Sequence, residues 1–250
     1  TKQDGNNFSE VSTTYFTSLR DNYQEEYIVV PNFYTRYFNN HTQLDLSTST
    51  EISVVGLTKT KSENNLRLNI SFDAEKKFEA QNGIQFKGTT KLSTNVYRIK
   101  GINEKTRFAK RLDPTLALEL NLPFFRKKPK QLDVIKPKLQ LVYNPSLKSN
   151  DEITSIDSQQ IKLDQTSLFS LNRFSGLDKQ ESGLRLNSGI EYSVENNDYF
   201  SYNFALGQIF RKDPSTQFSE GSGISGIKSD ILISGNFEYD SFLQMHAQQL

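Results

Sequence analysis

Apolar and polar residues alternate along most of this 250-residue chain. In "LRLNISFD" at positions 66–73, for example, every second residue is Leu, Leu, Ile or Phe, and the residues between them are Arg, Asn, Ser and Asp. Successive side chains of a β-strand point to opposite faces, so each such segment predicts a strand with one apolar and one polar face. No segment of useful length has the period of an α-helix. The sequence therefore predicts an all-β protein.

The alternating segments are longer than the strands of most globular proteins. About eleven strands are expected, most of them of 12 residues or more, against a usual length of about 5–6 residues. The expected strands are 8–20, 26–38, 43–55, 64–80, 84–100, 112–124, 131–143, 183–195, 199–211, 228–240 and 242–250. Short and long connections alternate between them, and the longest are residues 144–182 and 212–227.

The polar positions of these strands carry charged residues, among them Arg67, Glu119, Arg185 and Glu191. The core of a soluble β-sandwich or β-helix, which is the alternative, could not hold so many unpaired charges. Long strands with one apolar and one polar face are typical of an outer-membrane barrel, where they face lipid and lumen. No run of 18 apolar residues occurs, which excludes a transmembrane helix. We therefore predict an antiparallel transmembrane β-barrel.

Charge and histidine content limit the function classes. Thirty Lys and Arg residues balance 29 Asp and Glu residues, for a net charge of +1, so no nucleic-acid partner is expected. The two histidines, His41 in an expected turn and His246 in the last expected strand, have no nucleophile motif nearby. An outer-membrane barrel hydrolase is therefore a minor alternative. The acidic residues of 144–182 lack a calcium-loop signature, and we expect no enzyme, cofactor or metal site.

One segment, "SLFSLNRFSGLDKQESGLRLNSG" at 167–189, packs charges among aromatic residues and glycines. It resembles the signature of the LPS-assembly protein of the Gram-negative outer membrane (the LptD, or organic-solvent-tolerance, family). That signature reads approximately L-F-x-x-x-R-[FY]-S-G-x-D-R-x-E-x-G-x-R-x-N-x-G. The matching residues are Leu168, Phe169, Arg173, Phe174, Ser175, Gly176, Asp178, Glu181, Gly183, Arg185, Asn187 and Gly189. Asn172 matches a common variant of the signature, and Lys179 replaces its usual Arg. "LGQIFR" at 206–211, "GSG" at 221–223 and Ser229-Asp230 follow in the family's order.

The resemblance implies a partial barrel, in which residues 1–250 are a segment of the barrel domain. The family's N-terminal periplasmic domain and its first and last barrel strands are then expected outside this chain. The implied function is an outer-membrane translocon component that inserts lipopolysaccharide into the outer leaflet. The implied partners are lipopolysaccharide, a plug lipoprotein (LptE-type) in the lumen, periplasmic bridge proteins that contact the N-terminal domain, and outer-membrane lipids. A general porin or nutrient receptor barrel is the alternative.

The alternation and the resemblance together select candidate residues. The expected lumen-facing residues are Arg67, Asn69, Glu119, Asn121, Arg185, Asn187, Glu191, Ser201 and Asn203. The expected signature-loop residues are Phe169, Asn172, Arg173, Phe174, Ser175, Gly176, Asp178, Glu181 and Gly183. The loop either caps or lines the exit path, or forms an ion-pair and glycine-turn framework, with Arg173 and Arg185 against Asp178 and Glu181. We favour the framework and leave both interpretations open.

Overall fold

The computed structural model describes residues 1–17, 27–59, 63–81, 83–101, 105–145, 153, 155, 157–196, 200–239 and 243–249. Over these residues the protein is one antiparallel sheet of thirteen strands, which confirms the predicted all-β class. The one short 3-10 helix among them is Thr42–Leu44. No helix in the described part of the chain is long and apolar enough to cross a membrane.

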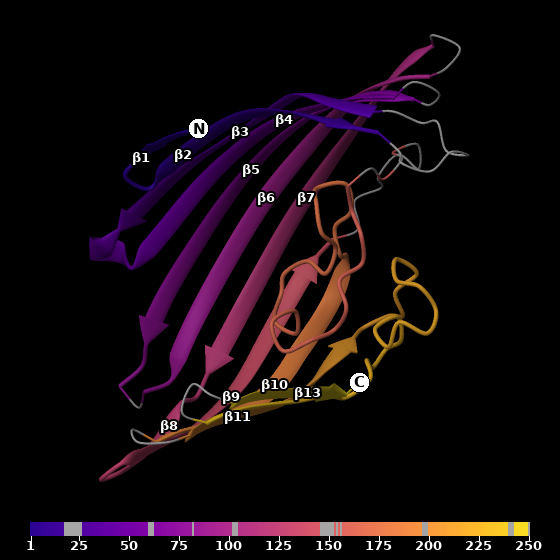
Figure 1. Ribbon diagram of the computed structural model, residues 1–250. Coiled ribbons are helices and arrows are strands. Elements are labelled where there is room, and N and C mark those ends of the chain that lie inside the picture. Colours follow the sequence, from indigo (N-terminus) through magenta and orange to yellow (C-terminus); the bar gives the residue numbers. More distant parts are fainter. Residues whose placement is uncertain are drawn as a thin grey trace. The chain divides into compact units, whose positions relative to one another are not determined.

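The strands follow one another in the sheet almost in chain order (Figure 1). Their bounds are β1 Lys2–Asp4, β2 Asn7–Phe16, β3 Tyr27–His41, β4 Leu46–Lys59, β5 Asn64–Glu79, β6 Gln85–Lys100, β7 Thr106–Asn121, β8 Phe124–Lys128, β9 Gln131–Asn144, β10 Gly183–Asn196, β11 Phe200–Arg211, β12 Leu232–Tyr239 and β13 Leu243–Gln249. The order runs from β1 to β13, with β9 beside β7 and the short β8 paired with β9. Each strand therefore pairs mainly with its neighbour in sequence, as in an up-and-down barrel wall.

Most expected strands are present, but several of their ends differ and β1 lies outside the expected list. β12, for example, begins at Leu232, four residues after the expected start at 228. His41, expected in a turn, is the last residue of β3, and the turn is the 3-10 helix that follows. β7 begins at Thr106, six residues before the expected start, because alternation continues through the charged stretch, with Phe108 and Leu112 exposed and Ala109 buried. The basic stretch that follows the expected strand 112–124 forms β8, whose Arg126 Nε donates to Oδ2 of Asp133 in β9 at 2.6 Å.

Some expected features fall beyond the described residues. The expected strand ends at 18–20 and at 240 lie outside them. His246 is in the backbone of β13, but its side chain is not among those described.

The chain divides into two compact units. The first comprises Thr1–Lys76, Thr90–Pro114 and Ser146–Ile156, and the second comprises Lys77–Thr89, Thr115–Pro145 and Asp157–Leu250. In the first unit, β5 shows how burial follows the alternation. Its buried residues are polar: Asn65, Arg67, Asn69 and Ser71. Its exposed residues are apolar, each between 37% and 44% exposed: Leu66, Leu68, Ile70 and Phe72. A water-soluble protein buries residues in the opposite sense.

The second unit repeats this inversion and adds two long loops. On β10, Arg185 and Asn187 are buried, whereas Leu184, Leu186 and Ile190 are exposed. The loops, residues 157–182 and 212–231, lie beside the strands of this unit in Figure 1. They pack against β11 and β12 through a small apolar core formed by Leu163, Leu168, Phe174, Ile209, Phe218, Ile224 and Leu232. The loops are therefore ordered by burial of their own apolar side chains.

Candidate functional site

The loop 157–182, which contains most of the signature segment, lies against the polar face of β9, β10 and β11. Gln140 of β9 donates through Nε2 to the carbonyl oxygen of Phe169, at 2.9 Å. Gln165 donates to Oδ1 of Asn203 in β11, at 3.1 Å. The loop is thus held to β9 and β11 by hydrogen bonds that involve polar side chains of these strands. Gln140 of β9 and Asn187 of β10 lie directly opposite each other in the sheet, so the alternation places both side chains on the same face.

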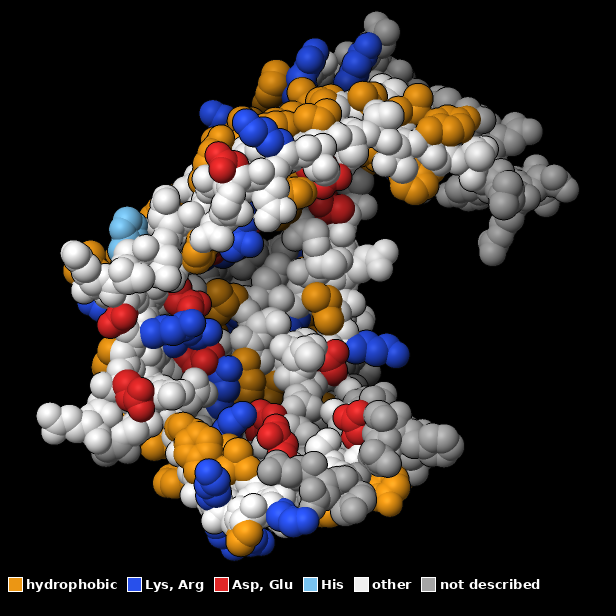
Figure 2. Space-filling model, turned by 60° about the vertical axis from the view of Figure 1, so that its left-hand side comes forward, with side chains coloured by type: hydrophobic (Ala, Val, Ile, Leu, Met, Phe, Trp, Pro, Cys, Tyr) orange, Lys and Arg blue, Asp and Glu red, His pale blue; other side chains and the backbone are white. Residues whose placement is uncertain are grey.

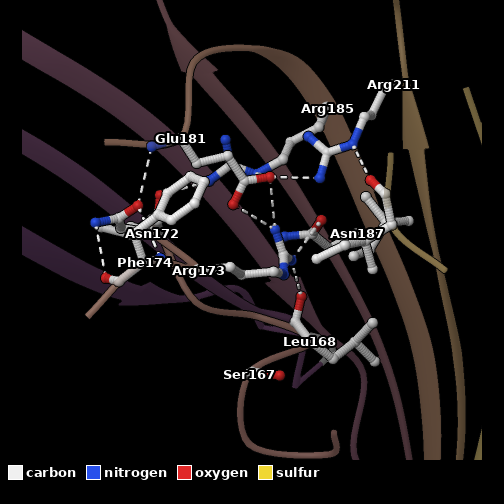
Figure 3. Close-up of polar contacts among 12 residues, drawn as sticks. Ser167, Leu168, Asn172, Arg173, Phe174, Glu181, Arg185, Asn187 and Arg211 are labelled. Carbon is white, nitrogen blue, oxygen red and sulfur yellow. Dashed lines mark hydrogen bonds and ion pairs between the residues drawn. The ribbon is translucent and has the colours of Figure 1, made fainter. Parts of the chain in front are cut away.

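Three arginines surround one glutamate at the end of this loop (Figure 3). Arg173 Nη1 lies 2.8 Å from Glu181 Oε2, and Arg211 Nη2 lies 2.6 Å from Glu181 Oε1. Arg185 Nε is 3.5 Å from the same Oε1. We call these four residues the arginine–glutamate cluster. Arg173 and Glu181 are fully buried and Arg185 is 1% exposed, so the cluster has no surface from which to bind a substrate.

The charge balance of the cluster determines the protonation state of Glu181. Burial alone would raise the pKa of this carboxyl, but the guanidinium groups of Arg185, Arg173 and Arg211 outweigh burial and lower its pKa. Burial also lowers the pKa of Arg173, and the attraction of Glu181 opposes that shift. Glu181 is therefore ionised at neutral pH and compensates part of a positive charge held out of water.

Backbone groups complete the cluster and fix the chain around it. Arg173 Nη2 donates to the carbonyl oxygen of Leu168 at 2.6 Å and to Oδ1 of Asn187 at 3.2 Å. Arg211 Nε donates to the carbonyl oxygen of Ile224 at 3.2 Å. The cluster consequently joins both long loops to β10 and β11.

Asn172 organises the turn that brings Arg173 and Glu181 together. Its Oδ1 accepts the backbone N–H of Glu181 at 2.9 Å, and its Nδ2 donates to the carbonyl oxygens of Phe174 and Lys179 at 3.1 and 3.0 Å. The ring of Phe174 stacks on Phe218 of the other loop, with centroids 4.8 Å apart. The side-chain amide therefore replaces the backbone pairing that a strand would supply.

The remaining signature residues support a second turn. Gly176 has a φ of +67°, and a Cβ there would meet Oδ1 of Asp157 at 2.4 Å. That Oδ1 also accepts the N–H of Leu177 at 3.1 Å. Asp178 Oδ2 accepts the N–H of Asp157 at 3.1 Å, and Ser175 Oγ accepts the N–H of Gln159 at 3.0 Å. Gly183, with a φ of +102°, leads the chain into β10. The carboxylates of this turn thus bind backbone N–H groups.

Two glycines receive the tip of the loop. Gly189 of β10 and Gly207 of β11 lie directly opposite each other in the sheet. The side chain of Leu168 lies over this pair, so that a Cβ on Gly207 would meet its Cδ2 at 2.2 Å and a Cβ on Gly189 would meet it at 3.1 Å. Any larger residue at position 207 would therefore displace the loop.

A chain of hydrogen bonds leads from the cluster along the polar face. Asn187 Nδ2 donates to Gln140 Oε1 at 2.7 Å, and Gln140 Nε2 donates to Glu119 Oε2 at 3.2 Å. Glu119 is buried and pairs with Lys138 at 3.1 Å and with Lys87 at 3.5 Å. The polar face of β7, β9 and β10 is thus one connected network.

The other predicted residues lie apart from this network or at its margin. Arg67 is buried on β5, in the first unit. Asn69 of the same strand donates to Asn95 Oδ1 at 3.0 Å. Glu191 accepts a hydrogen bond from Asn203, and both are half-buried. Ser201 is half-buried and lines a separate cavity with Asn203. The structure therefore brings together the predicted residues of β7 and β10, through Gln140.

Sequence reasoning missed several members of the site. Arg211, Gln140 and Lys138 were not among the candidates, although each occupies a polar position of an alternating strand. Arg211 ends the segment "LGQIFR" and Gly207 lies within it, so the family resemblance already includes both residues. What the sequence lacked was the pairing of β10 with β9 and β11, which sets these residues beside the signature loop.

Comparison with known proteins identifies the family. The sequence of residues 2–249 matches the family described as LptD, LPS transport system D. Comparison with curated proteins gives no match. Among solved structures, the transport unit of the autotransporter AIDA-I from Escherichia coli is 12% identical, with 99% of this chain and 90% of that chain covered and a TM-score of 0.37. That structural likeness is too low to carry an argument. The family match spans nearly all of the sequence, and the chain therefore belongs to the LPS transport system D (LptD) family.

Proposed function

We propose that this chain is part of the outer-membrane translocon that inserts lipopolysaccharide into the outer leaflet. The family match over residues 2–249 carries the proposal, because the family is a transport component. The inverted burial of the strands supports it, since apolar side chains face outward and polar side chains lie on the other face. Such a wall separates a lipid phase from a polar path.

The proposed mechanism follows from that separation. Acyl chains of lipopolysaccharide stay in contact with apolar surface, whereas its sugars pass along the polar face. A sugar on that face keeps hydrogen-bonding partners, because half-buried polar side chains such as Asn121, Glu191 and Asn203 lie along it. Losing those partners would cost roughly 1–3 kcal/mol for each buried polar group.

The proposal assigns residues 1–250 to the barrel domain of a longer protein in the outer membrane. The expected N-terminal periplasmic domain would contact the bridge proteins that bring lipopolysaccharide, and a plug lipoprotein would occupy the lumen. Arg67, Glu119, Glu191, Ser201 and Asn203 are then candidates for contact with sugar or plug. Both contacts suit side chains that are polar and lie on the same face.

For the signature loop we propose the framework role. Arg173, Glu181 and Arg185 are at most 1% exposed, which favours a structural contribution over direct contact with lipopolysaccharide. A buried network of opposite charges can determine the conformation of a loop without touching a ligand.

The test is surface delivery of lipopolysaccharide in cells depleted of the chromosomal copy. The full-length protein carrying this chain should restore newly made lipopolysaccharide at the cell surface, measured by its labelling with an impermeant reagent. A second arm measures the passage of small hydrophilic solutes. Solute flux without surface lipopolysaccharide would contradict this proposal and indicate a general porin instead.

A further inference from the structure

A cavity of about 740 Å³ lies below the tip of the signature loop, on the polar face of the second unit. Its wall includes Lys136 and Lys138 of β9, the amides of Asn121 and Gln165, and the ring of Phe169. We call it the lysine pocket. Its volume lies within the range of about 300–1,000 Å³ that is usual for small-molecule sites.

The two lysines differ in how they are held. Lys138 is fixed between Glu119, 3.1 Å away, and the face of the Phe169 ring, whose centroid is 4.4 Å from Nζ. Lys136 is exposed and makes no hydrogen bond or ion pair with any residue that the structure describes. Lys138 is therefore a positioned cation, and Lys136 is a cation whose donors are available to a ligand.

The other lining groups complement these cations. Asn121 and Gln165 present amides, which can donate to and accept from hydroxyl groups. Glu191 presents a carboxylate that already accepts a hydrogen bond from Asn203. Phe169 supplies an apolar surface against which the C–H face of a sugar ring can pack. Together the groups suit a ligand with several hydroxyls, one apolar face and one anionic substituent.

The neighbouring cavity of about 620 Å³ provides a contrast. It is lined by Glu195 and Glu238, with Ser201 and Asn203, and no Lys or Arg is among its lining residues in the described chain. Two carboxylates line that cavity, whereas in the lysine pocket two lysines outnumber the one lining carboxylate, Glu191, so an anionic ligand would be disfavoured in the first and favoured in the second. The selectivity for an anion is therefore a property of one cavity and not of the whole face.

We propose that the lysine pocket is a binding subsite for a saccharide unit that bears an anionic group, phosphate or carboxylate. The proposal rests on the proposed function, since it names a part of the transported molecule that this chain would hold. The subsite joins the arginine–glutamate cluster through Glu119, Gln140 and Asn187. Because Phe169 belongs to the signature loop, the framework that orders the loop also forms one wall of the subsite.

The test uses the full-length protein purified in detergent, with ligand-observed NMR titration of three acyl-free probes. The probes are a phosphorylated glucosamine disaccharide, a uronic-acid disaccharide and a neutral disaccharide. Wild-type protein should bind at least one anionic probe more tightly than the neutral one, and the preferred anion identifies the substituent. In Lys136→Gln/Lys138→Gln, affinity for that probe should fall about tenfold, the loss expected for one charge-assisted hydrogen bond. Affinity for the neutral probe should not change.

Two controls keep the outcome decisive. Lys212→Gln removes an exposed lysine of the same unit that is not among the pocket's lining residues, and should bind as wild type. Lys136→Gln alone removes a side chain that makes no hydrogen bond or ion pair within the described part of the chain. It tests the pocket even where the double variant does not fold, as judged by heat-modifiable migration. Equal binding of anionic and neutral probes by wild type, or unchanged binding by the lysine variants, would overturn the proposal.

The same preparations separate this inference from the proposed function. Surface delivery of lipopolysaccharide by wild type without probe binding would reject the subsite and leave the transport function in place. Failure of wild type to deliver lipopolysaccharide would reject the transport function itself, whatever the probes show.

Discussion

The arginine–glutamate cluster and the lysine pocket lie on the same polar face of the second unit, and both concentrate positive charge. In the cluster, the side chains of Arg173 and Glu181 are fully buried and in direct contact. In the pocket, the side chain of Lys138 is 28% exposed and Lys136 is exposed. The cluster buries its charges against one another, with Glu181 compensating part of the positive charge of three arginines, whereas the pocket keeps its charge accessible.

This difference separates a structural role from a binding role. Substitution of either partner of a buried ion pair lowers the stability of the protein, because the remaining charge would be left without solvent or counter-charge. An exposed lysine is solvated, so its removal costs little in stability and affects mainly what it binds. The comparison therefore predicts that substitutions in the cluster change folding and that substitutions in the pocket change recognition.

The largest effect is expected for Glu181→Ala. Three buried guanidinium groups would then face one another without a counter-charge, and we expect a loss of about 3–5 kcal/mol in stability. Urea unfolding of the full-length protein in detergent, together with protease cleavage within residues 157–182, measures the loss. Glu220→Ala, an exposed position in the other long loop, should leave both unchanged. If the loop of Glu181→Ala is still protected from protease, the cluster does not have the structural role that distinguishes it from the pocket.

Gly207→Ala should have the next largest effect. The added Cβ would lie 2.2 Å from Leu168 and 3.0 Å from the carbonyl oxygen of Ser188, and overpacking of this kind costs about 1–3 kcal/mol. Protease cleavage of the loop should increase, and less so in Gly189→Ala, where Leu168 is 3.1 Å away. Gly88→Ala is the matched control, since nothing lies within 4 Å of its Cβ. Equal cleavage in all three variants would show that Leu168 does not anchor the loop.

Acid should weaken the cluster in a defined direction. The pKa of Glu181 lies below its ordinary value of 4.5, so its contribution to stability is complete above that pH and is lost as pH falls through the lowered value. Between pH 5 and 8, a window that lies wholly above the ordinary carboxyl pKa of 4.5, this contribution should be constant. Hydrogen exchange of the loop amides against pH measures it. Glu181→Gln should lack the acid-dependent step, and its persistence there would assign the step to another group.

The smallest effect on stability is expected for Lys136→Gln. Lys136 is exposed, and its substitution should change the free energy of unfolding by less than about 0.5 kcal/mol. Urea unfolding checks this value on the preparation used for probe binding. A destabilisation as large as that of Glu181→Ala would mean that the pocket, too, is part of the framework.

Much of the fold could be predicted from the sequence, because alternation is a local property. The polar positions of β5 and β10 follow directly from the spacing of Leu66, Leu68, Leu184 and Leu186. The start of β7 was misplaced because dense charge around Arg107 and Lys110 is typical of loops, whereas here it lies within a strand. The family, too, could be recognised, from residues 167–189 together with the segments at 206–211 and 221–223 that follow them in the family's order.

The candidate site could be predicted only in part. Arg173, Glu181 and Arg185 are close in the sequence, and an ion-pair framework was among the expectations for them. Arg211 and Lys138 are remote from the loop in the sequence, and no local pattern assigns them to Glu181 or Phe169. Their contacts arise from strand register, which places residues from β9 and β11 beside β10.

The sequence by itself therefore determined the class of structure and the two faces of its strands, because a period of two requires only neighbouring residues. Only the tertiary structure decided which charges are buried together and which remain accessible. Burial depends on what the loop 157–182 covers, and the loop is positioned by Leu168 over Gly189 and Gly207 and by contacts between residues far apart in the chain. The same residue type, a cation on the polar face, is structural beneath the loop and available for binding at its edge.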